Sequence, residues 1–453
     1  MKKRKIFLLT AILLLTTFLF TSCNATDSMS GGGGGFAGGS LDFGSKGESI
    51  DGSLSGSSPE KAPSGTESDK AESDSDDSAD SKEESDGSEV INRPAGLITA
   101  AAWNDNDNYE YWKTLFMQAE GETAAGKFFG MTGDNSWGFN SFNRIKVTVK
   151  HGEEKIAGAY VVAKDANQSI LFSAVTDANG VAYLFTDAEF GEITVASSES
   201  ITTVPFTKDE RELTVECTAS NEKQNLIELM FVVDVTGSMG DELEYLKNEI
   251  ADVVARVAAN NANTKINLAL LFYRDTTDRE QFKYHDFVDV TASGGIDKVI
   301  AAIDSQSATG GGDYPEAVDK ALEMAANKQW STGATTKIIF QILDAPPHST
   351  ATNKTTFKKA VDTAAEKGIR ICPIICSGAE TLTEYLMREA AIYTGGTFVF
   401  VTDDSGIGNS HHDPDLPNVT VEALNSLMVR LINGYHTGEF EDPVNWREEA
   451  PNN

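Results

Sequence analysis

From about residue 225 onward, apolar strand-like runs alternate with segments of helical periodicity, and this alternation constrains the fold more than any other feature of the sequence. The run over 226–233 is almost continuously apolar, as expected for a parallel strand that is buried on both faces. The alternation predicts a doubly wound α/β domain with a mostly parallel sheet over 223–437, followed by a C-terminal tail over 438–453. Further strands are expected at 266–273, 337–343, 369–376 and 397–401, and helices at 241–259, 314–326, 356–367, 381–393 and 421–433.

The segment over 91–222 has a different, β-like pattern. Residues 145–149 alternate between apolar and polar, as a half-buried strand does, and 159–163 and 181–185 are further strand candidates. An Asn-Gly turn at 179–180 supplies the positive φ angles that a tight hairpin needs. Short strands separated by turns predict a small β-sandwich. The segment resembles the sandwiches related to the carboxypeptidase regulatory domain, which present or space a neighbouring domain.

The N-terminus has the organisation of a bacterial export signal. Four basic residues at 2–5 precede an apolar stretch over 6–20, which is short for a membrane span. The Phe-Thr-Ser-Cys that follows resembles a lipobox, in which the cysteine, here Cys23, is acylated and becomes the new N-terminus. The resemblance implies a signal peptide over 1–22 and an extracytoplasmic protein, at the cell surface, that is held at the membrane only by its lipid.

Residues 23–90 are rich in Gly, Ser and acidic side chains, and this composition predicts a disordered tether because it cannot bury a core. The whole chain has 69 acidic and 37 basic residues, a formal net charge of −32 at pH 7. Such a surface repels a phosphate backbone, which argues against a nucleic-acid partner, and it favours cations. The Asn- and Asp-rich run over 104–108 is expected to be a polar turn, with calcium binding as the alternative.

Asp234, Thr236 and Ser238 alternate directly after the first predicted strand of the α/β domain and before a helix. Alternate side chains on such a loop can converge on one point, and doubly wound sheets bind ligands at the carboxyl ends of their strands. A carboxylate and two hydroxyls are hard oxygen ligands that suit Mg²⁺, with Mn²⁺ and Ca²⁺ as alternatives. The loop lacks the glycine pattern and the lysine of a nucleotide-phosphate site.

The Asp-x-Thr-x-Ser pattern resembles the first segment of the metal-ion-dependent adhesion site of von Willebrand factor A domains. The third segment of that family, an aspartate ending the fourth strand, is matched by Asp344. The sequence Asp-Ala-Pro-Pro-His over 344–348 resembles the hemicentin-type and alpha-kinase-associated branch. The middle segment of the family is a threonine before a helix, and this chain instead has Thr-Gly-Gly-Gly-Asp-Tyr-Pro-Glu over 309–316.

The middle ligand therefore stays open between Asp313, Glu316 and Thr309. Spacing to the following helix places Asp313 at the position of the family's threonine, and it is the preferred candidate. The Asp-x-Pro-Glu order also resembles integrin β-subunit I-like domains, in which the glutamate can reach the metal. Arg274 and Asp275, at the end of the second predicted strand, are interpreted as a structural ion pair rather than a rim contact.

The resemblance implies a binding protein rather than an enzyme. One coordination position of the cation would be filled by an Asp or Glu carboxylate of a protein partner, because the charge of the ion inverts the local field of a very acidic chain. Two alternatives are an envelope-complex scaffold with a structural metal, and a hydrolase in which the metal activates water and Glu316 is the base. The sequence shows no Ser/His/Asp arrangement and no His-Glu-x-x-His motif. His348, four residues beyond Asp344, is interpreted as a loop residue, with a position near the metal as the alternative.

Overall fold

The computed structural model describes residues 96–118, 125–198, 200–218, 223–406, 410–412, 414 and 416–448. The predicted signal peptide, Cys23 and the acidic tether lie outside these residues, as does the end of the C-terminal tail. Within the described ranges, no helix is both long and apolar enough to cross a membrane.

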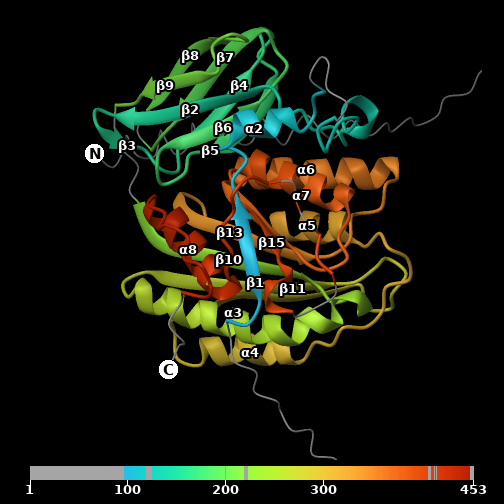
Figure 1. Cartoon of the computed structure of the whole chain (residues 1–453). Coiled ribbons are helices and arrows are strands. Elements are labelled where there is room, and N and C mark those ends of the chain that lie inside the picture. The colour runs from blue at the N-terminus through green and yellow to red at the C-terminus, as the bar shows by residue number, and fades with distance from the viewer. Residues whose placement is uncertain are drawn as a thin grey trace, which may run out of the picture. The chain divides into compact units, whose positions relative to one another are not determined.

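An eight-stranded sheet forms the centre of the α/β domain, with the strand order β12-β11-β10-β13-β14-β15-β1-β16 (Figure 1). The strands from β11 to β15 in this order are parallel, whereas β12 and β1 pair antiparallel with their neighbours. The doubly wound, mostly parallel sheet predicted from the sequence is therefore confirmed. The strands are β1 (Thr99–Trp103), β10 (Lys223–Asp234), β11 (Lys265–Tyr273), β12 (Phe282–Asp289), β13 (Ala334–Leu343), β14 (Ile369–Ile375), β15 (Phe398–Val401) and β16 (Glu422–Ala423).

Helices cover both faces of this sheet, which is why β14 is buried at every position. Helices α3 (Gly240–Asn260), α4 (Gly295–Asp304) and α8 (Leu424–Thr437) contribute to the core on one face. Helices α5 (Val318–Ala326), α6 (Ala351–Lys367) and α7 (Thr381–Thr394) contribute to the core on the other face. Helices α6, α7 and α8 each end at a glycine in the left-handed conformation, as a helix C-terminus commonly does.

A sandwich of two four-stranded sheets precedes β10 in the chain. Its turn at 179–180 differs from the expected hairpin, because β5 and β6 lie in different sheets and the turn carries the chain from one to the other. Gly180 has a φ of +68°, while Asp177 accepts the N–H groups of Asn179 and Val181. One sheet contains β2 (Arg144–His151), β3 (Glu154–Lys155), β6 (Val181–Phe185) and β9 (Glu212–Glu216); the other contains β4 (Tyr160–Lys164), β5 (Ile170–Val175), β7 (Phe190–Ala196) and β8 (Ile201–Thr207).

The domain expected over 91–222 differs from the structure in its first residues. Strand β1 lies within the large sheet, where Ala100 to Trp103 pair with Val401 to Phe398 of β15. Ala100 and Ala101 are fully buried on opposite faces of the sheet. The sandwich is therefore inserted between two strands of the α/β domain. This arrangement depends on long-range strand pairing, which the alanine-rich sequence of β1 does not predict.

Aromatic side chains join the sandwich to the α/β domain through one continuous core. Phe185 of β6 stacks on Tyr393 of α7 with ring centroids 4.3 Å apart. Trp112, on the short helix α2 (Tyr109–Thr114), packs edge-on against Phe128, which in turn packs against Tyr385 of α7. This shared burial stabilises the sandwich and the α/β domain together, because apolar area from both is removed from water at the same place.

Candidate metal centre

The loop that follows β10 brings Asp234, Thr236 and Ser238 together. The Asp234 Oδ1 atom accepts hydrogen bonds from the Thr236 N–H at 2.9 Å and from the Thr236 hydroxyl at 2.7 Å. The Thr236 and Ser238 hydroxyl oxygens lie 3.2 Å apart. Asp234 and Thr236 are buried and Ser238 is exposed, so the three oxygen groups lead from the sheet interior to solvent.

Glu316 and Asp344 lie at the same edge of the sheet. Asp344 directly follows β13, and the Glu316 N–H donates to the Pro346 carbonyl at 3.0 Å. Between these segments passes Gly311, which has a φ of +75°. A Cβ atom on Gly311 would lie 2.9 Å from Glu316 Oε1 and 3.3 Å from Thr236 Cβ, so a glycine is needed for the loop to run this close to both.

The carboxylates at this edge repel one another without a compensating cation among the described side chains around them. Burial and the neighbouring Asp344 raise the pKa of Asp234 to about 7. Burial together with Asp234, Asp275 and Asp344 raises the pKa of Glu316 to about 9. The Asp234 Oδ2 and Glu316 Oε2 atoms are buried and accept no hydrogen bond of ordinary geometry from the described residues. A cation bound here would stabilise the charged carboxylates, and it would therefore lower the pKa values of Asp234 and Glu316.

Arg274 does not supply that cation, and it does not form the expected ion pair with Asp275. Its guanidinium donates to the backbone carbonyls of Thr309 at 2.8 Å, Ser307 at 3.1 Å and Glu280 at 3.4 Å. The side chain therefore holds the loop that leads to Gly311 in place. The Thr309 N–H donates to the Val235 carbonyl, so the backbone of Thr309 is bonded to the loop that follows β10. The residue itself is exposed.

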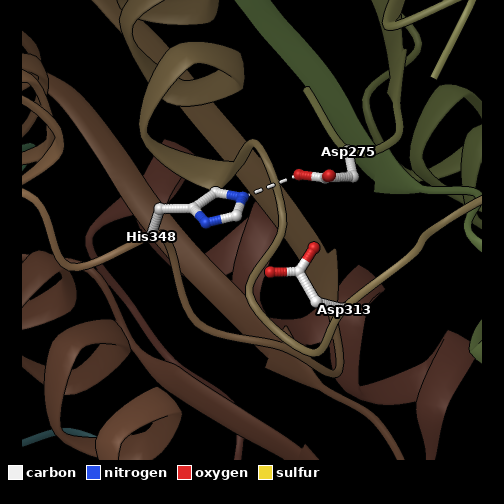
Figure 2. Close-up of side chains that lie close together, drawn as sticks. All are labelled: Asp275, Asp313 and His348. Carbon is white, nitrogen blue, oxygen red and sulfur yellow. Dashed lines mark hydrogen bonds and ion pairs between the residues drawn. The ribbon is translucent and has the colours of Figure 1, made fainter. Parts of the chain in front are cut away.

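Asp313 lies with Asp275 and His348, and Figure 2 shows the three side chains directed toward one another. His348 Nε2 is 2.7 Å from Asp275 Oδ1, and one ligand atom from each of the three lies within 4.8 Å of the others. Burial favours a raised pKa for Asp275, but hydrogen bonds from His348, Thr276 and Thr277 lower it to about 2. Within the ranges that the structure describes, this is the one group of three His, Cys, Asp or Glu side chains placed closely enough for a shared ion.

The structure thus divides the residues singled out from the sequence between two neighbouring groups. Asp234, Thr236 and Ser238 form one group with Glu316 and Asp344 beside them, whereas Asp313 belongs to the second group. Sequence reasoning favours an ion pair with Arg274 over a rim contact for Asp275, and a loop role over a position near the metal for His348. Its position in the sequence could have identified Asp275: it comes two residues after β11, at the carboxyl edge of the sheet where Asp234 ends β10.

Comparisons with known proteins agree with this fold. The family model of the von Willebrand factor A domain matches residues 228–402. A putative ariadne-like RING finger protein, R811 of Acanthamoeba polyphaga mimivirus, is 29% identical over an alignment of 227 residues that covers 46% of this chain and 21% of that one. This chain therefore spans about a fifth of the length of that relative.

Solved structures with similarity to this chain match it at low identity and low TM-score. BatB of Bacteroides thetaiotaomicron, a conserved hypothetical protein, has 16% identity, with 39% of this chain and 90% of that chain covered at a TM-score of 0.30. The open conformation of the pilus adhesin SpaC of Lactobacillus rhamnosus GG has 11% identity, with 70% of this chain and 38% of that chain covered at a TM-score of 0.35.

Proposed function

From the premise that this chain contains a von Willebrand factor A domain, we propose that it binds a protein partner through one divalent cation at the carboxyl edge of its large sheet. Asp234, Thr236, Ser238, Glu316 and Asp344 would hold the ion. A carboxylate from an Asp or Glu of the partner would complete the coordination. The single observation that carries the proposal is the presence of buried carboxylate oxygens on Asp234 and Glu316 that lack ordinary hydrogen-bond donors.

The donor set fits a hard cation. Carboxylate and hydroxyl oxygens are the ligands that Mg²⁺ and Ca²⁺ prefer, and the absence of sulfur or nitrogen from this group favours Mg²⁺, with Mn²⁺ as an alternative. A buried carboxylate is costly unless it is paired or bound to a metal. A divalent ion between Asp234, Glu316 and Asp344 would offset the repulsion that raises the pKa values of the first two.

Glu316 has the strongest support among the three candidates for the middle ligand. It is 4% exposed, its Oε1 atom faces the glycine that separates it from Thr236, and its Oε2 atom accepts no hydrogen bond from the described residues. Asp313 is exposed and grouped with Asp275 and His348. In the proposal Asp313 lies on the rim around the ion, where it would meet the partner.

A binding role fits this arrangement better than catalysis. The proposed ligands would hold the ion from the side of the sheet. Ser238 and Tyr314 are exposed, so the opposite side of the ion would be open to a partner. Glu316 is the only base that the hydrolase alternative offers, and in this proposal its carboxylate is engaged by the metal. The N-terminal signal and Cys23 lie outside the described residues, and acylation of Cys23 with placement outside the cytoplasm forms part of the same proposal.

The metal is tested first, by titrating the chelator-treated protein with Mg²⁺ and Mn²⁺ in a calorimeter. Asp234→Asn should abolish saturable binding, because it removes the carboxylate at the centre of the group. The metal-free variant should be at least as stable as the wild type, since the substitution removes a buried charge. Asp297→Asn, at an exposed position on α4, is the matched control and should bind like the wild type. Unchanged metal affinity in Asp234→Asn would contradict the proposal.

The partner is tested second, by cross-linking on the surface of cells that express the chain, with and without EDTA. A partner that is captured by the wild type but lost with EDTA or in Asp234→Asn supports metal-dependent binding. Capture that persists in both would favour the alternative of an envelope scaffold with a structural metal.

A further inference from the structure

A pocket at the amino ends of β13 and β14, opposite the metal edge, collects basic side chains in a very acidic chain. Its cavity volume is small, about 20 Å³, and it opens to solvent. Thr335, Thr336 and Lys337 line it from β13, and Arg370 lines it from β14. His436 of α8 and sandwich loops around Gly158 and Asp177 complete the wall. The pocket therefore lies where the sheet, the last helix and the sandwich meet.

Arg370 contributes a guanidinium to the wall of this pocket. The side chain belongs to a residue that is 7% exposed, and it carries no hydrogen bond or ion pair to any described residue. The central carbon of its guanidinium lies over the ring of Tyr435, 5.4 Å from the ring centroid. The Thr335 hydroxyl, which also lines the pocket, is buried without a hydrogen-bond partner among the described residues. The Thr335 hydroxyl is thus a buried donor without an acceptor among the described residues, although buried donors are normally satisfied. The Arg370 nitrogens beside it are not sealed from solvent.

Lys337 adds a second buried cation to the same wall. Its residue is 5% exposed, and its Nζ atom donates to the Lys367 carbonyl at 2.9 Å, which leaves further donor capacity on the ammonium group. Burial, helped by the charges of Arg370 and Lys367, lowers the pKa of Lys337 to about 8 against the opposing effect of Glu228. An anion in the pocket would relieve this repulsion between cations.

Two acids near these cations, Glu228 and Asp177, are engaged elsewhere. Glu228 accepts the N–H of Ser331 at 2.8 Å and the Ser331 hydroxyl at 2.7 Å. One carboxylate oxygen of Asp177 accepts two backbone N–H groups of its own turn, both at 2.8 Å. Neither acid forms an ion pair with Arg370 or Lys337 within the described residues, so both cations can still pair with a bound anion.

We propose that this pocket binds a small free oxyanion, with inorganic phosphate or sulfate as the chemical class. The planar guanidinium of Arg370 would form paired, charge-assisted hydrogen bonds with two of its oxygens, and the Lys337 ammonium and Thr335 hydroxyl would donate to the others. The limited space favours a free ion over a headgroup or a peptide carboxylate. The proposal does not depend on the metal site.

The test is a calorimetric titration of the full chain with phosphate, sulfate and acetate at constant ionic strength, without divalent ions. We expect saturable phosphate or sulfate binding that Arg370→Gln weakens at least tenfold. Arg447→Gln, at an exposed arginine, is the matched control and should bind like the wild type. Nonspecific anion binding is not expected from a chain of net charge −32.

A second variant guards against misfolding of Arg370→Gln. Thr335→Val keeps the shape of the side chain and removes only the unpaired hydroxyl, so the anion-free protein should be as stable as the wild type or more stable. We expect it to weaken phosphate binding severalfold and to reduce the rise in Tm that phosphate causes. No saturable binding at millimolar phosphate, or equal binding by wild type, Arg370→Gln and Thr335→Val, would overturn the proposal. Saturation by acetate alone would overturn the preference for phosphate and sulfate.

Discussion

The buried ion pair between Asp105 and Arg388 offers a sharp test of how the segment after β1 is held to the α/β domain. Arg388 of α7 is 0% exposed, and its Nε and NH2 atoms donate to the two carboxylate oxygens of Asp105. Its NH1 atom donates to Glu384 at 2.9 Å. A carboxylate oxygen of Glu384 also lies 2.7 Å from the Lys127 ammonium and 2.6 Å from His412 Nε2. Because Glu384 is shared among these partners, it cannot by itself compensate the charge of Arg388.

Asp105→Asn should therefore leave a buried positive charge without adequate compensation. The substitution keeps the volume of the side chain but removes one acceptor atom and the negative charge. Breaking a buried pair by removing one partner costs about 3–5 kcal/mol. Domains have a total stability of only about 5–15 kcal/mol, so the change is a large part of it. Asp362→Asn, which breaks the partly exposed i,i+4 pair with Lys358 on α6, should cost under about 1 kcal/mol.

The assay is urea unfolding of both variants, followed by tryptophan fluorescence, because Trp112 lies 5.1 Å from the Arg388 guanidinium and reports on this region. In a second step, Arg388→Met is combined with Asp105→Asn. The double variant should recover part of the loss, because methionine packs among the rings of Trp112, Phe128 and Phe398 without a charge. If the free energies of unfolding of Asp105→Asn and Asp362→Asn differ by less than about 1 kcal/mol, the conclusion that the Asp105–Arg388 pair stabilises the fold is refuted.

Two further predictions concern single buried positions. Burial raises the pKa of Glu389 from 4.5 to about 8, so the folded state holds a proton that the unfolded state releases, and stability falls as pH rises through this window. Glu389→Gln should exceed the wild type in Tm at pH 8 but not at pH 5; equal shifts at both values would contradict the sign. Gly368→Ala should destabilise the fold by about 1–3 kcal/mol in urea unfolding, because φ is +67° and the new Cβ would lie 2.8 Å from Val175. Gly406→Ala has the same φ with open space around it, so a similar loss there would show that the contact with Val175 is unimportant.

The parallel core of the α/β domain could be predicted because its strands are recorded locally in the sequence. The expected strand at 369–376 and the observed Ile369–Ile375 nearly coincide, since a run buried on both faces is apolar throughout. Strand β12, Phe282–Asp289, was not predicted. It is an antiparallel edge strand that is only half-buried, and its mixed sequence has neither a continuous apolar run nor a clean alternation.

The candidate site shows the same limit. The Asp234 loop could be predicted because its three ligand types are adjacent in sequence and follow a strand. The pairing of Asp275 with His348 joins residues separated by 73 positions, and only the folded sheet brings them to one point. In the run over 104–108, the expected polar turn forms around Asn104, but Asp105 points inward to Arg388. A single sequence does not reveal which aspartate of such a run has a buried partner.

The insertion of the sandwich after β1 limits how the chain can be shortened. A chain beginning at β10 would lack the strand between β15 and β16, and the exposed edge of β15 would offer unpaired backbone groups to other chains. Excising 104–222 alone would require a linker from β1 to β10, which lie four strand positions apart in the sheet, about 19 Å. In the native chain the sandwich itself bridges that gap, so it acts as a folded connector as well as a separate layer.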